Sequence, residues 1–135
     1  MAAYILPEND ASIALFSSLL KERGHKVDLF DATYYQTNHG INSDGTKAEH
    51  LNVMPFSLGE RGIKMRDADW RIDIVEKVQS FEPDLIALST TEDMWELGVK
   101  ALEHIKEYKV KNRIPVIAGG VFATFAPDLA LNESL

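Results

Sequence analysis

The sequence contains no cysteine among its 135 residues. This absence excludes disulfide bonds, zinc sites built from cysteine and iron–sulfur clusters held by cysteine thiolates. It agrees with a cytoplasmic protein. The chain also lacks a basic cluster: Asp and Glu together number 21 against 14 Lys and Arg, so the formal net charge is −7. Such an acidic chain is a poor partner for nucleic acid or for an anionic membrane.

Long apolar runs are absent as well. The longest ones extend over only a few residues, far short of the roughly 20 that a membrane-spanning helix needs. The first residues have neither the basic start nor the apolar centre of a signal peptide. The 4 histidines are scattered, and no pair has the spacing of metal ligands. We therefore expect one cytoplasmic domain over residues 1–135, without a protein-ligated metal.

What the chain does contain is an alternation of strand and helix patterns. Short apolar, β-branched runs predict strands at 2–6, 26–30, 84–89 and 114–118. Helical spacing predicts helices at about 12–23, 70–81 and 90–108, and another that begins at 127. The apolar faces of the first three helices are predicted to comprise Ile13, Phe16, Leu19 and Leu20; Trp70, Ile74, Val78 and Phe81; and Met94, Gly98, Ala101, Leu102, Ile105 and Tyr108. Strand–helix–strand units at this spacing predict a parallel sheet.

Polar residues at the expected helix ends supply candidate caps. Gly24 is predicted to follow the first helix as its C′ residue. Ser89 and Glu92 have the spacing of a capping box. The candidate N-caps, in chain order, are Asp10 or Ser12, then Asp67 or Asp69, then Ser89, Thr90 or Thr91.

The regular pattern is lost between about 32 and 68. A loop of this length in a compact domain is usually either functional or disordered. Because the segment starts directly after the second strand, its base is expected at the carboxyl edge of the sheet. Two interpretations stay open here: a lid folded over that edge, and plain disorder.

Hydroxyls and glycines follow two successive strands. Ser89, Thr90 and Thr91 come at the end of the third strand, and Gly119 and Gly120 follow the fourth. The carboxyl ends of parallel strands share one edge, where open α/β sheets bind ligands. Glycines there let a ligand approach without meeting a Cβ. This pattern predicts a site for a polar or phosphate-bearing ligand; the alternative is a capped helix and a tight turn.

Two further pairs of residues lie near this predicted site. Glu92 and Asp93 are acidic residues in a first helical turn, so they are either ligand contacts or simple partners of the helix dipole. Trp95 and Phe122 are expected to pack in the core, with an apolar wall beside the ligand as the alternative.

Several stretches of the chain resemble a known family. Residues 81–89 with Thr91, Glu92 and Asp93, and residues 114–124 with Ala126 and Pro127, resemble the cobalamin-binding domain at the N-terminus of B12-dependent radical SAM enzymes. Residues 19–31 are similar to that family's first helix and second strand. The resemblance covers most of the chain outside the irregular segment.

The resemblance implies a flavodoxin-like (Rossmann-like) three-layer α/β fold that holds cobalamin over the carboxyl edge of its parallel sheet. The cofactor's nucleotide tail would pass beside the hydroxyl loop and the double glycine. With Glu92 added as their acidic neighbour, the predicted cofactor-binding residues are Ser89, Thr90, Thr91, Glu92, Gly119, Gly120, Val121, Phe122, Ala123 and Thr124. Related domains that ligate cobalt carry a histidine after the first strand. The loop at 7–10 has none, which predicts base-off cobalamin without a protein imidazole on cobalt.

The chain departs from the family in two respects. A radical SAM domain needs a cysteine triplet, so SAM and its 4Fe-4S cluster would belong only to a remainder of the parent enzyme. The sequence also stops before a fifth strand, which predicts a truncated sheet and a fragment that is not catalytic alone. An unpaired sheet edge would favour a homodimer. The alternatives are a flavodoxin-like interaction or regulatory module without a cofactor, and a nucleotide or flavin binder.

Overall fold

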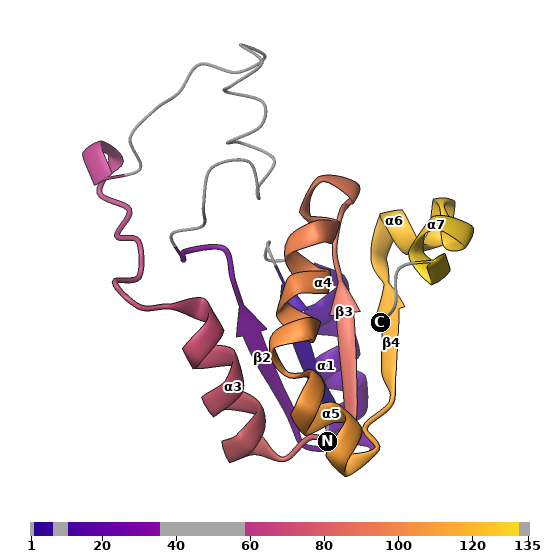
Figure 1. The fold of residues 1–135 in the computed structure, drawn as a ribbon. Coiled ribbons are helices and arrows are strands. Elements are labelled where there is room, and N and C mark those ends of the chain that lie inside the picture. Colours follow the sequence, from indigo (N-terminus) through magenta and orange to yellow (C-terminus); the bar gives the residue numbers. More distant parts are fainter. Residues whose placement is uncertain (1, 7–10, 36–58, 133–135) are drawn as a thin grey trace.

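A computed structural model describes residues 2–6, 11–35 and 59–132 of the chain. Within these ranges lie four strands: β1 (Ala2–Leu6), β2 (Val27–Asp31), β3 (Leu85–Ser89) and β4 (Val116–Gly119). Neighbouring strands are parallel throughout, in the order β2-β1-β3-β4 (Figure 1). The predicted mixed α/β class and parallel sheet are therefore confirmed.

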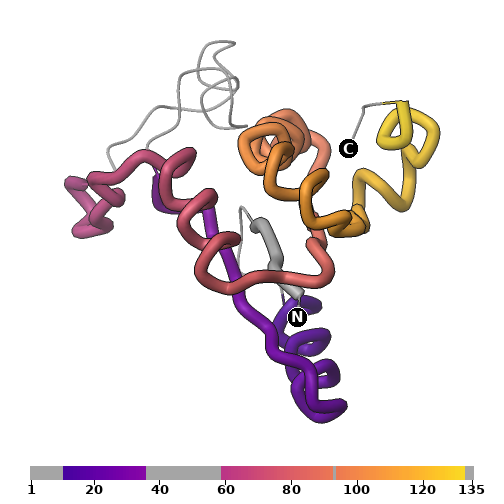
Figure 2. Tube along the Cα trace, turned by 60° about the horizontal axis from the view of Figure 1, so that its bottom comes forward, coloured from indigo at the N-terminus to yellow at the C-terminus, as the bar shows by residue number. Residues whose placement is uncertain are grey.

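Helices cover both faces of this sheet. The helical elements are α1 (Ala11–Glu22), η1 (Gly59–Arg61), α3 (Trp70–Phe81), η2 (Glu92–Met94), α4 (Trp95–His104), α5 (Lys106–Asn112), α6 (Gly120–Phe125) and α7 (Pro127–Asn132). Figures 1 and 2 show α1 on one face of the sheet and α3, α4 and α5 on the other. At the β4 edge, α6 and α7 lie beyond the carboxyl end of the strand.

The main core lies between the sheet and the layer of α3 and α4. Ile86 and Leu88 of β3 are each 1% exposed and pack there with Ile74 of α3 and Leu102 of α4. Ala87, between them in β3, belongs instead to a smaller cluster with Ile13 of α1. Side chains that alternate between two covered faces explain why the strand reads as an unbroken apolar run.

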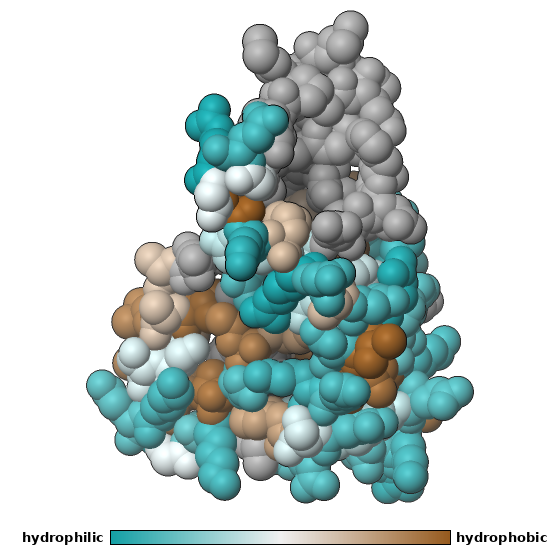
Figure 3. Space-filling view, turned by 90° about the vertical axis from the view of Figure 1, so that its left-hand side faces the viewer, coloured by the Kyte–Doolittle hydropathy of each residue, from teal (hydrophilic) through white to brown (hydrophobic). Residues whose placement is uncertain are grey.

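The apolar face of α1 differs from the predicted one. Ile13 is buried and Leu20 half-buried against the sheet, but Phe16 is 57% exposed and Leu19 36% exposed. Successive helical residues are about 100° apart, so Ile13 and Leu20 share a narrow stripe while the other two lie on its flank. In Figure 3, hydrophobic surface gathers in the lower left of the view, toward the face that carries α1.

The start and end of α1 can be compared with the predicted caps. Ser12 lies inside the helix, which begins at Ala11, so it is not the N-cap; Asp10 falls outside the described residues. Gly24 has φ of +83° and its N–H donates to the carbonyl of Lys21 at 3.0 Å. The predicted glycine C′ position is confirmed.

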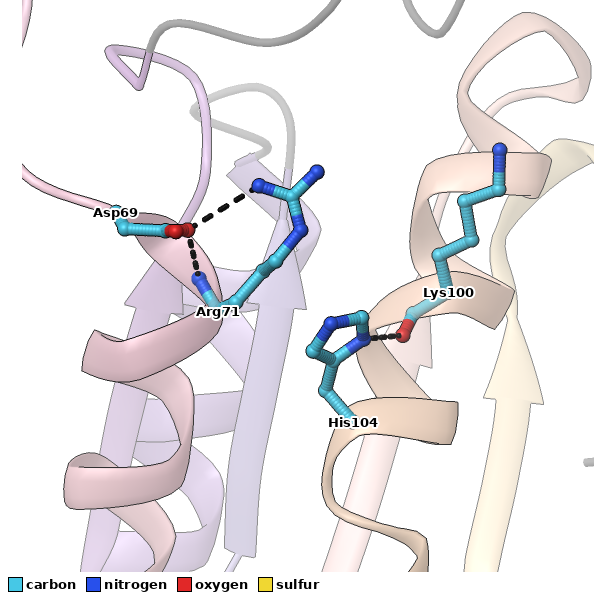
Figure 4. Close-up of polar contacts among 4 residues, drawn as sticks. All are labelled: Asp69, Arg71, Lys100 and His104. Atoms are coloured by element: carbon cyan, nitrogen blue, oxygen red, sulfur yellow. Dashed lines mark hydrogen bonds and ion pairs between the residues drawn. The ribbon is translucent and has the colours of Figure 1, made fainter.

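Helix α3 has the predicted bounds, and Asp69 rather than Asp67 caps it. The Asp69 carboxylate accepts a hydrogen bond from the Arg71 amide at 2.9 Å (Figure 4). The helix ends at Phe81, and its C-cap residue, Glu82, lies in the left-handed region with φ of +51°, just before Pro83. Across from this N-terminus, the Trp70 and His104 rings lie 5.1 Å apart. His104 Nδ1 donates to the Lys100 carbonyl at 2.9 Å (Figure 4).

The single helix predicted over 90–108 is divided into η2, α4 and α5. The break between α4 and α5 falls at Ile105, whose φ of −102° and ψ of 10° leave the helical region although its side chain is buried. The predicted capping box is also wrong. Ser89 is still paired with Gly119 in the sheet, and Thr91 occupies the N-cap position of η2.

The last helix begins at Pro127, as predicted, but α6 before it was not predicted as a helix. The insertion at about 32–68 lies mostly outside the described residues. Its two ends are joined by an isolated parallel bridge between Tyr35 and Arg66. In the part of the chain that the structure describes, we find no helix with the length and apolar character to cross a membrane.

Candidate ligand site at the carboxyl edge of the sheet

The loops after β3 and β4 lie in direct contact. Ser89 and Gly119 are register partners at the ends of the two strands. A methyl group placed with ideal geometry on Gly120 would lie 2.8 Å from the Thr90 carbonyl oxygen and 3.1 Å from the Thr90 amide nitrogen. It would also lie 3.3 Å from Ser89 Oγ. The structure therefore brings together the hydroxyl loop and the double glycine that the sequence singled out.

Gly120 has a structural reason to be glycine. Its φ is +89°, a conformation that other residues rarely adopt. A side chain there would also overlap the Thr90 backbone. The tight turn that was the alternative interpretation of the double glycine thus accounts for Gly120 fully.

Gly119 has no such reason. Its φ of −140° and ψ of −167° describe extended backbone that any residue adopts. Among the residues that the structure describes, a methyl group on Gly119 would meet nothing within 4 Å. The absence of a side chain at Gly119 therefore leaves open space at the carboxyl end of β4, directly beside the end of β3.

The hydroxyl residues differ in their exposure. Thr90 is 6% exposed, and its Oγ1 donates to the Thr91 carbonyl at 3.0 Å. Ser89 is half-buried, whereas Thr91 and Glu92 are exposed. The side chain of Asp93 lies outside what the structure describes. Thr90 therefore stabilises its own loop, and Thr91 and Glu92 present polar side chains at the edge of the sheet.

The predicted wall formed by α6 is only partly available to a ligand. Phe122 and Ala123 pack against the main core, and the Phe122 ring lies 4.9 Å from that of buried Trp95. The expected core packing of Trp95 and Phe122 is confirmed. Val121 is exposed; the exposed Thr124 donates from Oγ1 to the Gly120 carbonyl at 2.7 Å, which fixes the first turn of α6.

A polar cluster at the base of the insertion was missed from the sequence. Tyr35 is 3% exposed; its hydroxyl donates to Asp73 Oδ2 at 2.7 Å and accepts from the Arg66 guanidinium at 2.9 Å. The Arg66 guanidinium lies 4.9 Å from the centre of the Tyr35 ring, which stacks at 5.6 Å on Phe30. Burial and the bond to Asp73 raise the pKa of Tyr35, against the opposing effect of Arg66. The sequence signal for this cluster was a pair of tyrosines at the start of the irregular segment.

This edge of the sheet provides open space at Gly119, exposed hydroxyl and carboxylate groups, and a rigid floor of two paired strands. These features suit binding of a polar group rather than bond cleavage, because no nucleophile–base pair is present among the residues described at the site. Within the same described ranges, no group of three or more His, Asp or Glu side chains is arranged to hold a metal ion. Comparison of the chain with protein-family models, with curated proteins and with solved structures finds no match.

Proposed function

We propose that this chain is a cobalamin-binding module of the kind found in B12-dependent radical SAM enzymes. The observation that carries the proposal is the direct contact of the Thr90 and Gly120 loops at the ends of two paired parallel strands, with Gly119 left open beside them. The sequence resemblance assigns the cofactor's nucleotide tail to these loops. The open side of Gly119 fits close approach of such a tail.

The order of the strands supports a flavodoxin-like fold. The order β2-β1-β3-β4 agrees with the first four strands of the flavodoxin-like order 2-1-3-4-5. In that fold, ligands bind outside the carboxyl ends of the strands, at the place where the order reverses. Ser89 and Gly119 end strands β3 and β4 and so lie at the carboxyl edge. The order reverses between β1 and β3, which places Ser89 beside the reversal and Gly119 one strand away from it.

Cobalamin, when bound, would supply methyl transfer or radical chemistry to the parent enzyme. The residues of this chain would hold the cofactor: Ser89, Thr91 and Glu92 through polar contacts, and Gly119 through the space that it leaves. Residues 7–10, which follow β1 in the sequence, include no histidine, so we propose base-off binding without a protein imidazole on cobalt. SAM and the 4Fe-4S cluster would belong to a separate, cysteine-containing domain. The lack of cysteine also favours a cytoplasmic location.

The test is retention of hydroxocobalamin by the purified chain. The chain is mixed with hydroxocobalamin and desalted, and corrin absorbance is measured in the protein fraction. We expect retained absorbance that Gly119→Val strongly reduces, because valine fills the open space. A matched control, Ser18→Val on an exposed position of α1, should retain cobalamin like the wild type. Circular dichroism confirms that both variants are folded.

Absence of retained corrin in the wild type would overturn the proposal and favour a flavodoxin-like interaction module without a cofactor. Equal retention by Gly119→Val would refute the placement of the tail at this loop. Nitrogen splitting in the cobalt(II) EPR spectrum of the bound form would contradict base-off binding without an imidazole ligand.

A further inference from the structure

One short helix concentrates positive charge on this acidic chain. Helix α5 and its C-cap residue carry four basic side chains within eight residues: Lys106, Lys109, Lys111 and Arg113. The one acidic residue of α5, Glu107, forms no ion pair with any of them. The expectation that the chain lacks a basic cluster is therefore wrong for this helix.

The cations of the neighbouring helices are arranged differently. Every Lys and Arg of α3 and α4 forms an ion pair: Arg71 with Asp69, Lys77 with Asp28 and Lys100 with Glu96. Among the residues that the structure describes, no ion pair involves a cation of α5 or of its C-cap. The positive charge of α5 is thus left uncompensated within the described ranges.

The stability of the helix does not account for this arrangement. Cations in a last helical turn favour the negative end of the dipole, which explains Lys111 and Arg113. Lys106, however, is the first residue of α5, where a cation is unfavourable. It also lies three residues before Lys109, so the two like charges repel each other. Burial, together with the charge of Lys106, lowers the pKa of Lys109. Local costs of this kind are typical of functional surfaces.

Three of these cations share one side of α5 with an exposed apolar residue. Lys106, Lys109 and Arg113 follow one another at intervals of three and four residues, the spacing of a single helical side. Val110 lies four residues after Lys106 and three before Arg113, and it is 67% exposed. We call these four residues the α5 basic face. An apolar centre bordered by charged groups is the usual composition of a protein–protein interface.

We propose that the α5 basic face binds an acidic segment of a partner protein. Carboxylates of the segment would pair with the three cations, and an apolar side chain of the segment would cover Val110. A nucleic acid backbone offers no such apolar group, and the net charge of −7 would repel a long polyanion from the rest of the surface. A short segment avoids this repulsion, since salt screens charges farther than about 8 Å away.

The position of α5 keeps this surface apart from the candidate ligand site. The helix ends at Asn112, just before β4 begins at Val116, so it lies toward the amino edge of the sheet. Ser89 and Gly119 lie at the carboxyl edge, at the other end of the strands (Figure 1). A partner on α5 would leave the carboxyl edge accessible. The proposal is therefore independent of cobalamin binding.

Fluorescence anisotropy tests the proposal with the full chain and a fluorescein-labelled peptide of alternating glutamate and leucine. We expect saturable binding in the micromolar range, because one short helix provides few contacts, and weaker binding as salt is added. The double variant Lys106→Glu, Arg113→Glu should bind at least roughly tenfold more weakly, and Val110→Ser several-fold more weakly. Lys106→Arg, which keeps the charge, should bind like the wild type.

The matched control is the double variant Lys21→Glu, Lys26→Glu. It changes the net charge by the same amount at two exposed positions outside α5, and it should keep the wild-type affinity. Absence of peptide binding by the wild type at up to about 1 mM protein would overturn the proposal, as would an equal loss of affinity in the two double variants. Tighter binding of an oligothymidylate than of the peptide would also overturn it, in favour of a nucleic-acid surface.

A stability measurement on the single variant Lys106→Glu separates a functional role from a structural one. Because the substitution removes the repulsion with Lys109 and places an acid in the first turn of α5, its Tm should equal or exceed that of the wild type. A lower Tm would show that Lys106 supports the fold, which contradicts the argument for a binding surface. Circular dichroism confirms that all the variants are folded.

Discussion

Replacing Gly120 by alanine is the most direct test of how the two loops are held together. The substitution has two consequences. The alanine backbone must adopt a φ of +89°, and its methyl group lies 2.8 Å from the Thr90 carbonyl oxygen and 3.1 Å from the Thr90 amide nitrogen. Both close contacts are with backbone atoms, so rotation of a side chain cannot relieve them.

The expected loss of stability is the sum of these two effects. A non-glycine residue in a sparsely populated positive-φ conformation costs about 1–3 kcal/mol. Insertion of a methyl group against a packed backbone costs a further 1–3 kcal/mol or so. A destabilisation of roughly 2–6 kcal/mol is large against the total of about 7–20 kcal/mol expected for 135 residues. It corresponds to a Tm lower by roughly 7–21 °C.

Gly119→Ala is the matched control, one residue away. The backbone of Gly119 is extended, and a methyl group there meets no atom of the described part of the chain within 4 Å. We expect its stability to lie within about 0.5 kcal/mol of the wild type, because the reduced entropy of the unfolded chain offsets a slightly poorer N-cap. Urea unfolding followed by circular dichroism measures both variants.

A third variant shows which contact matters. Ser89→Ala in the Gly120→Ala background removes the contact at 3.3 Å with Ser89 Oγ but leaves both Thr90 contacts. We expect it to restore less than about 0.5 kcal/mol, since the remaining strain involves backbone. If Gly120→Ala were as stable as Gly119→Ala, the two loops would not be in the close contact described, and the candidate site would not have this geometry.

Two further predictions concern ionisable side chains. Tyr35→Phe should cost about 1–2 kcal/mol, because Asp73 and Arg66 each lose a hydrogen bond. Because the pKa of Tyr35 is raised in the folded state, its contribution to stability is complete below the unfolded pKa of about 10 and is lost as pH rises through the higher folded pKa. Urea unfolding between pH 8 and 11 should therefore show a smaller loss of stability at alkaline pH for Tyr35→Phe than for the wild type. An equal loss in both would contradict the assignment. For Asp28, burial acts to raise the pKa, but the hydrogen bonds from Lys77 and the Leu29 amide, with the nearby lysine charges, lower it overall. The contribution of the Asp28–Lys77 pair is then present above pH 4 or so and is lost as pH falls through the lowered folded pKa. Since both side chains are about one-third exposed, Asp28→Asn should cost less than about 1 kcal/mol of stability at pH 7. In urea unfolding, the difference in stability between this variant and the wild type should vanish by about pH 2. A difference that persists at that pH would show that the ion pair does not cause it.

The helices show which features of the fold local sequence signals can predict. The bounds of α3 follow from an apolar period, a capping aspartate and a following proline, all of which are local. The break at Ile105 has no such signal. Its side chain is buried in the main core while its backbone leaves the helical region, so tertiary packing prevails over an uninterrupted helical pattern.

The candidate site, too, could be predicted only in part from the sequence. The sequence placed Ser89 and Gly119 at the ends of successive strands, which parallel winding allows to be neighbours. The pairing of β3 with β4 in the sheet makes them so. It did not distinguish the two glycines. That distinction depends on a φ of +89° at Gly120 and on its distance to the Thr90 backbone, which arise only when the two loops pack together.

The sequence alone determined the α/β class, the four strands and the edge at which hydroxyls and glycines meet, because strand and helix periodicity and parallel connections are local or nearly local properties. Only the tertiary structure decided which apolar side chains are buried. Phe16 and Ile13 belong to the same predicted apolar face of α1, but Phe16 is exposed whereas Ile13 is buried against Ala87. Gly98 lies in α4 where a methyl group would come within 2.8 Å of Leu88 Cδ1. Burial and close approach depend on elements distant in the sequence, and no local pattern specifies them.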